Sequence, residues 1–163
     1  NCLAYGGSAG GAAIVSGAAS VATLDNCDYI GGTYGINRVG GVVTCRNCYA
    51  RGTTAAYQGT ITKTTAASSD ATGSTGLQNI AYSTANFTNV TAGSEDLHLI
   101  SGSALVNVGT DLSASFTTDI DGQTRSGTWD VGAGEYVAGG GGTVTHLIGG
   151  SLCNSRLTRS ILI

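Results

Sequence analysis

The first third of the chain carries a dipeptide repeat. Asn-Cys occurs at Asn1-Cys2, Asn26-Cys27 and Asn47-Cys48, so its periods are 25 and 21 residues. Gly6-Gly7 follows the first pair at the same offset as Gly31-Gly32 follows the second. Periods of about 20 to 50 residues are typical of solenoids, whose repeats stack on one another. The sequence therefore predicts a coil of short parallel strands, with rungs about 4.8 Å apart.

Within the repeat, apolar residues alternate with polar ones. Successive side chains of a strand point to opposite faces, so every second residue faces the core. The predicted inward residues are Ala22, Leu24 and Asn26 in one rung, and Val43, Cys45 and Asn47 in the next. Asparagine suits such a turn because it tolerates left-handed backbone angles, and stacked amides can bond from rung to rung. We expect a structural ladder of Asn1, Cys2, Asn26, Cys27, Asn47 and Cys48.

Composition favours strands and turns over helices. The 163 residues include 27 Gly, no Pro, no Met and only 10% charged residues. Strong helix formers are scarce, and no window keeps apolar residues at helical spacing for more than about one turn. The prediction is one all-β domain. Because the chain opens on Asn1 in mid-repeat, we also expect it to belong to a longer protein.

The charges are unevenly distributed. The net charge is −3, yet residues 143–163 hold Arg156, Arg159 and no acidic residue. The remaining, acidic body repels phosphate backbones, so we expect no nucleic-acid partner. No run reaches the roughly 20 apolar residues that cross a bilayer, so no membrane span is expected either.

The second half carries four motifs in a fixed order: DLHL at 96–99, GSALVNVG at 102–109, DIDGQTR at 119–125 and WDVGAGEY at 129–136. With the Asn-Cys rungs before them, they resemble the closing part of bacterial and phage right-handed parallel β-helix repeat proteins, over roughly residues 1–137. The resemblance implies a right-handed parallel β-helix on a virion surface or outside a cell. It implies no activity, because this fold carries enzymes, adhesins and inert virion parts alike.

Between the repeat and these motifs, the period blurs. The polar stretch 63–75 is predicted to be a long loop on the side of the coil. Residues 97–99 and 104–109 are predicted to be two further strands joined by a Ser-Gly turn.

The composition of the chain changes after the body at 1–137. A glycine linker at 138–142 leads to the tail 143–163, and an exposed apolar tail needs a surface to bury against. The predicted anchoring residues are Leu147, Ile148, Leu152, Leu157, Ile161, Leu162 and Ile163. We expect the tail to dock onto a capsid, tail or filament protein, or to add strands to a neighbouring copy in a homo-oligomer such as a trimer. The alternative is a tail folded back along its own coil.

Candidate catalytic and metal residues carry little signal. Cys45 and Cys48 have C-x-x-C spacing without a second pair, so two buried thiols are expected rather than a metal or redox site. The close acidic pairs are Asp25 with Asp28, Glu95 with Asp96, and Asp119 with Asp121. The last of these, with Asp130, could hold calcium, but a turn is the simpler interpretation. His98 is expected to face solvent, and His146 lies in the tail.

These observations predict a non-catalytic structural protein without a cofactor. The alternative is a glycan-binding or polysaccharide-cleaving β-helix, because aromatic side chains along one lateral face could stack on sugar rings. The candidate tyrosines for such a face are Tyr5, Tyr29, Tyr34, Tyr49, Tyr57 and Tyr82.

Overall fold

The computed structural model describes residues 1–6, 11–15, 17–138 and 152–153. These residues form thirteen strands and no helix, so the all-β class is confirmed. Within the described ranges, no helix is long and apolar enough to cross a membrane.

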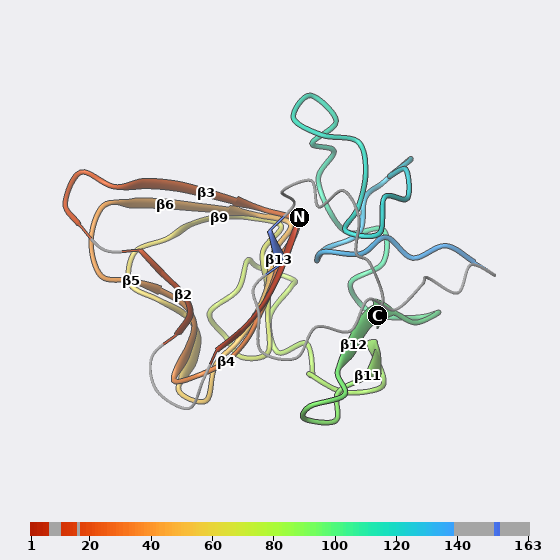
Figure 1. The fold of residues 1–163 in the computed structure, drawn as a ribbon, viewed down its shortest axis with the longest axis horizontal. Coiled ribbons are helices and arrows are strands. Elements are labelled where there is room, and N and C mark those ends of the chain that lie inside the picture. Colours follow the sequence, from red (N-terminus) through yellow and green to blue (C-terminus); the bar gives the residue numbers. More distant parts are fainter. Residues whose placement is uncertain (7–10, 16, 139–151, 154–163) are drawn as a thin grey trace, which may run out of the picture.

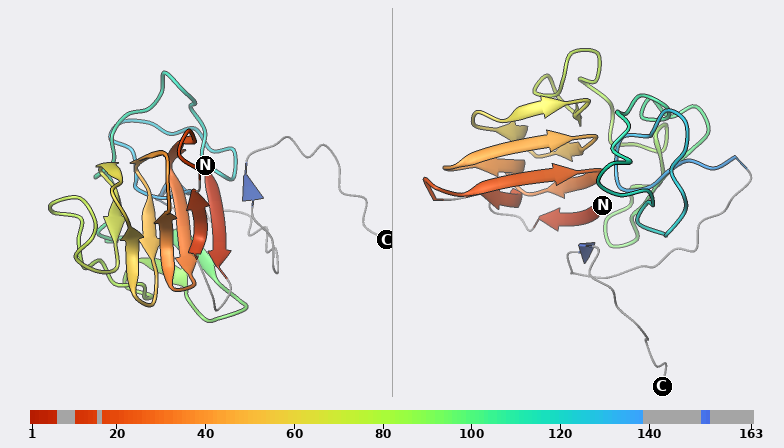
Figure 2. Two further views of the ribbon diagram at one scale, coloured as in Figure 1. Left: turned by 90° about the vertical axis from the view of Figure 1, so that its left-hand side faces the viewer. Right: turned by 90° about the horizontal axis from the view of Figure 1, so that it is seen from above.

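Ten short strands at the start of the chain form three parallel sheets. Sheet A contains β1 (Cys2–Gly6), β4 (Cys27–Gly31), β7 (Tyr49–Arg51) and β10 (Ala67–Ser68). Sheet B contains β2 (Gly11–Val15), β5 (Tyr34–Arg38) and β8 (Ala55–Gln58). Sheet C contains β3 (Val21–Asp25), β6 (Val42–Arg46) and β9 (Thr62–Thr64). The chain visits the three sheets in turn, and each strand pairs with the strand three places later; we call residues 1–68 the three-sheet stack (Figures 1 and 2).

The pairing register follows the repeat. Leu24 lies opposite Cys45 in sheet C, and Ala22 lies opposite Val43, which is the alignment that the sequence predicts. Cys2 lies opposite Cys27 in sheet A. Parallel pairing in a constant register stacks equivalent side chains on one another, so one inward pattern serves all rungs.

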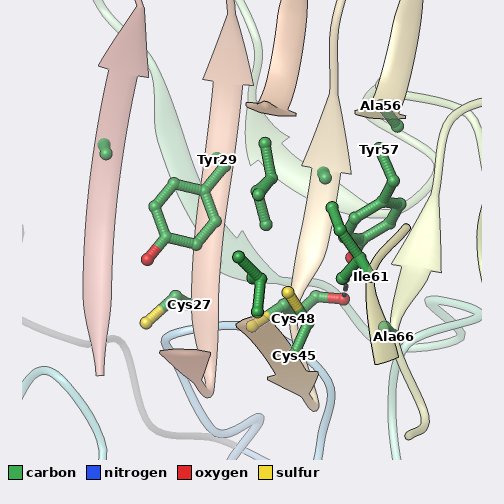
Figure 3. Packing of buried hydrophobic residues seen from close by; sticks show 12 residues of the cluster. Cys27, Tyr29, Cys45, Cys48, Ala56, Tyr57, Ile61 and Ala66 are labelled. Atoms are coloured by element: carbon green, nitrogen blue, oxygen red, sulfur yellow. Dashed lines mark hydrogen bonds between the residues drawn. The ribbon is translucent and has the colours of Figure 1, made fainter. Parts of the chain in front are cut away.

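The inside of the stack is a narrow apolar core. Its buried members come from all three sheets and include Tyr29, Ile36, Val43, Cys45, Cys48, Ala56 and Tyr57 (Figure 3). The Tyr57 hydroxyl lies within hydrogen-bond distance of the carbonyl oxygens of Cys48 (3.1 Å) and Ala67 (3.0 Å), to either of which its single proton can be donated. A buried tyrosine therefore keeps its polar end bonded while its ring fills the core.

A second core lies on the outer face of sheet A. Side chains from residues 77–136 pack there, beside the stack (Figure 1). They include an antiparallel pair, β11 (Phe87–Asn89) and β12 (Asp96–Leu99). The rings of Tyr49 and Phe87 meet edge to face with centroids 5.1 Å apart. Sheet A is thus buried on both faces, as parallel sheets generally are.

The last rung of the stack is capped by polar side chains. Asp70 Oδ2 accepts from the Ala56 amide (2.7 Å), and Thr72 Oγ1 accepts from the Tyr57 amide (3.1 Å). These bonds satisfy part of the edge that β8 would otherwise expose. The prediction of a lateral loop at 63–75 was wrong in part, because β9 overlaps its start, β10 falls within it, and the residues after β10 cover the end of the stack.

The predicted strand at 104–109 is absent, although Asp96–Leu99 does form β12. Asn107 has a φ of 56°, which an extended strand cannot contain. Residues 105–136 instead run over the stack as irregular backbone, held there by bonds such as that from the Gly132 amide to the Asn47 carbonyl oxygen (2.8 Å). We call residues 105–136 the closing segment.

Candidate functional site

Asn26 and Asn47 occupy the corner between sheets C and A. Asn26 joins β3 to β4, and both asparagines are fully buried. Their φ angles are 47° and 52°, in the left-handed region that asparagine tolerates better than most residues. The left-handed backbone therefore accounts both for the sharp corner and for the asparagine found there.

The two amides form a ladder that continues into the closing segment. Asn47 Nδ2 donates to Asn26 Oδ1 (3.2 Å) and to the Thr110 carbonyl oxygen (2.7 Å), and the Thr110 amide donates back to Asn47 Oδ1 (2.8 Å). Asn26 Nδ2 donates to the carbonyl oxygens of Asp130 (3.1 Å) and Gly132 (3.2 Å). The ladder thus holds the closing segment as well as the rungs.

Thr65 takes the third corner position, and the sequence analysis missed it. Its φ is 48°, and its hydroxyl donates to Asn47 Oδ1. The register of the structure explains its place, because Thr64 pairs with Arg46 just as Arg46 pairs with Asp25. The residue after each of these three strand positions takes the corner.

Asn1 bonds to the closing segment. Its Nδ2 donates to the Thr118 carbonyl oxygen (2.6 Å), and its Oδ1 accepts from Arg125 Nη2 (3.2 Å). Of the predicted ladder, the structure brings Asn26 and Asn47 into direct contact and places Asn1 against residues more than 100 positions away.

Arg125 is the buried centre of the closing segment, and the sequence analysis did not single it out. It is 4% exposed. Its guanidinium donates to Glu135 Oε2 (2.8 Å) and to the Ala133 carbonyl oxygen (2.6 Å), and it lies 5.4 Å from the Trp129 ring centroid. Burial lowers the pKa of Arg125, and the Glu135 and Asp119 charges partly offset that effect.

The aspartates of the closing segment bind backbone amides. Asp119 Oδ1 accepts from Asp121 N (2.9 Å) and Gln123 N (2.8 Å), and its Oδ2 accepts from Glu135 N (3.0 Å). Asp130 Oδ1 accepts from Asn107 N (2.7 Å). The Asp119 and Asp121 pair therefore builds a turn, and no group of metal-binding side chains occurs in the part of the chain that the structure describes.

His98 does not simply face solvent, contrary to the prediction. Its Nδ1 bonds to Asp96 Oδ1, and its Nε2 lies 2.7 Å from Asp121 Oδ2. Burial by itself lowers the pKa of His98, but the bonds to Asp96 and Asp121 outweigh it and raise the pKa above its usual value. His98 thus links β12 to the turn at 119–123; His146 lies outside the described residues.

Asp28 lies on the outer face of β4, under the closing segment. It is 2% exposed, and its Oδ2 accepts from Ala133 N (3.0 Å). Its Oδ1 has no hydrogen-bond partner among the described residues. Burial raises the pKa of Asp28 to about 7, against the opposing effects of that amide bond and of Arg125.

Three cysteines are free and buried in the stack: Cys27, Cys45 and Cys48 (Figure 3). Cys27 Sγ donates to the Asp25 carbonyl oxygen (3.0 Å), and Cys48 Sγ donates to that of Leu24 (3.2 Å). Hydrogen bonding to Cys48, together with burial, raises the pKa of Cys27, and burial raises that of Cys48. A thiol that stays protonated is a poor nucleophile and a poor metal ligand, so Cys27 and Cys48 act as core residues.

Five of the six candidate tyrosines do not form the lateral face proposed for sugar stacking, and Tyr34 is half-buried on β5. Tyr29, Tyr49 and Tyr57 are buried in the two cores, and the hydroxyls of Tyr5 and Tyr82 are buried as well. Burial of such large apolar rings stabilises the two cores more than exposure to solvent would. That expectation was wrong for these five residues.

Two residues of the tail are described. Leu152 and Cys153 form β13, which pairs antiparallel with β1 so that Cys153 lies opposite Cys2. This placement agrees, for these two residues, with a tail folded back along its own stack. The other predicted anchoring residues lie outside the described residues: Leu147, Ile148, Leu157, Ile161, Leu162 and Ile163.

The polar side chains of the corner and of the closing segment are bonded mostly to the chain's own backbone. Groups held in this way fix the path of the backbone. Comparison with protein-family models, with curated proteins and with solved structures finds no match to this chain.

Proposed function

We propose that the chain is the C-terminal part of a right-handed parallel β-helix, acting as a non-catalytic structural protein of a virion or an extracellular appendage. The order of strands in the three sheets supports the helix, because each turn of three strands returns to the first sheet. About 98% of the crossover connections between parallel strands of one sheet are right-handed, which supports the handedness.

The observation that carries the structural role is the bonding of Asn26 and Asn47. Both amides bridge the rungs and the closing segment at once. A polar network that is satisfied in this way favours one rigid arrangement over alternatives. Rigidity along a stack is what a displayed fibre or decoration protein requires.

The tail is proposed to anchor the stack to a capsid, tail or filament protein, or to a second copy in a homo-oligomer such as a trimer. In the described part of the tail, the two residues of β13 pair with the edge of β1. Ile161, Leu162 and Ile163 follow within about ten residues, enough extended chain to reach some 33 Å. A partner surface would bury these aliphatic side chains.

The test is the mass of the assembly in solution, measured by light scattering after size-exclusion chromatography. The full chain is compared with a full-length variant that carries Ile161→Ser, Leu162→Ser and Ile163→Ser. Val39→Ser is the matched control, because Val39 is a 67% exposed aliphatic residue of the stack. A lower mass for the tail variant alone supports association of copies through the tail; equal, monomeric masses for all three proteins refute the homo-oligomer.

A further inference from the structure

The contact between β4 and the closing segment holds more acidic groups than basic ones. Asp28, Asp119 and Asp130 are each 2% exposed or less, and the Glu135 side chain is 8% exposed. One guanidinium, that of Arg125, is buried with these four carboxyl groups. Full ionisation would leave a buried surplus of negative charge, which is costly in a region of low dielectric constant. We call this contact the junction.

Asp28 is the least compensated of the four carboxyl groups. Only its Oδ2 receives a hydrogen bond, and its Oδ1 faces Gly132, where an added Cβ would lie 2.7 Å from that oxygen. The charged or titratable groups that act on it are Arg125 in the closing segment, His98 in β12, the amino group of Asn1, and the tyrosines Tyr5, Tyr49, Tyr57 and Tyr82. A proton on Asp28 removes a buried charge without removing its bond to Ala133 N.

His98 fastens the other side of the closing segment. It stands between Asp96 of β12 and Asp121 of the turn at 119–123. A protonated imidazole donates from both nitrogens and therefore satisfies both carboxylates. A neutral imidazole has one donor, so one carboxylate then faces a nitrogen lone pair.

We propose that the junction is an acid-tightened clasp: the closing segment binds the stack more firmly at mildly acidic pH and opens locally as the pH rises toward and beyond neutrality. Asp28 and His98 work in the same direction, because each holds the segment best when it carries its proton. The inference goes beyond the proposed structural role and does not depend on what the tail binds.

Proton linkage gives the direction in which each group changes the stability of the closed form. Asp28 has a pKa of about 7 in the closed form and a usual value of 3.8. Its contribution to closure is therefore full below about pH 4 and is lost as the pH rises through about 7. His98, whose pKa is raised in the closed form, contributes fully below its usual value of 6.5 and loses that contribution at higher pH. Burial also raises the pKa values of Asp130 and Glu135, which adds to the same trend.

The experiment is hydrogen exchange of the full chain at pH 5 and pH 7.5, read by mass spectrometry and corrected for the pH dependence of chemical exchange. Peptides from 105–136 report the closing segment, and peptides from 42–58 report the rungs. From Asp28 alone, we expect the opening constant of 105–136 to rise on the order of 50-fold between these pH values, with little change at 42–58. Trp129, the single tryptophan and 2% exposed, gives a second readout, since its emission should shift to longer wavelength on opening.

Two variants with opposite expected effects separate the clasp from general instability. Asp28→Asn imitates the protonated carboxyl group and should hold the segment closed at pH 7.5, reducing the pH effect to less than about tenfold. His98→Gln imitates the neutral imidazole and should loosen the segment at pH 5. Asp111→Asn is the control, because Asp111 lies in the same segment, is exposed, and caps Ser113 N with an oxygen that asparagine retains.

Equal protection of 105–136 at the two pH values would overturn the proposal. So would an Asp28→Asn variant that is folded, as judged by protection at 42–58, but keeps the wild-type pH dependence. If Asp28→Asn fails to fold, His98→Gln and the wild-type chain still decide, because the clasp requires both the pH effect and its reduction by the histidine substitution.

Discussion

At the residue scale, asparagine meets two requirements at the corner. The left-handed backbone excludes most side chains, and the interior of the stack excludes unpaired polar atoms. Asn47 meets both, with a φ of 52° and side-chain bonds to Asn26 and Thr110. Glycine would meet the first requirement only. The amide is therefore retained for its bonds as much as for its backbone.

Replacement of Asn47 by alanine is expected to lower the free energy of unfolding by about 3 kcal/mol, because it leaves buried partners unpaired and strains the backbone. Asn79→Ala is the matched control, since Asn79 has a φ of 58° but is exposed. We expect about 1 kcal/mol there. Urea unfolding of both variants measures the difference, and equal losses would show that the amide bonds contribute nothing.

At the element scale, each rung depends on its neighbours for hydrogen bonds, so the ends of the stack need other partners. The β8 end uses side chains: Asp70 accepts from the amides of Ala56 and Thr72. Burial raises the pKa of Asp70, but these bonds and the Thr72 hydroxyl outweigh it and lower the pKa. The cap is therefore strongest when Asp70 is ionised.

Asp70→Ala is expected to destabilise the chain by about 1 to 2 kcal/mol and to speed hydrogen exchange at Ala56, because that amide loses its acceptor. Asp70→Asn keeps an acceptor and is expected to cost less. Since ionised Asp70 stabilises the fold, its contribution should be lost as the pH falls through its lowered pKa, the opposite of the Asp28 effect. Unchanged exchange at Ala56 in the alanine variant would contradict the capping role.

At the scale of the whole molecule, the closing segment joins the first residue of the stack to its middle rungs. Arg125 bonds to Asn1, to the backbone at 132–133 and to Glu135, so one buried cation connects parts of the chain far apart in sequence. Removing one partner from such a network leaves the other charges buried and uncompensated.

Arg125→Met is expected to cost about 3 to 5 kcal/mol, because Glu135 would remain buried without its partner. The control is Arg38→Met, since Arg38 is half-buried on β5 and its Nε donates to the Gly41 carbonyl oxygen (2.7 Å). Thermal unfolding followed at Trp129 and by circular dichroism compares the two variants. A loss for Arg125→Met no larger than that for Arg38→Met would rule out a central role for the guanidinium.

The periodic part of this protein could be predicted from the order of its residues. The spacing of Asn26 and Asn47 and the alternation around Leu24 and Cys45 sufficed to predict the all-β class and the rung register. Both are local or repeated signals, because neighbouring rungs contain equivalent residues about twenty positions apart, and the pleat alternates with a period of two.

The position of residues 69–136 could not be predicted in this way, because it depends on contacts between distant parts of the chain. Asn26 bonds to Gly132, and Ala133 bonds to Asp28, across more than 100 residues of sequence. Such contacts do not recur along the chain, so no periodic pattern in the sequence predicts them. This packing buries the tyrosines on the outer face of sheet A, gives His98 its two bonds and places Arg125 at the centre of the closing segment. It is driven by the hydrophobic effect, which is non-directional and so does not specify which residues meet.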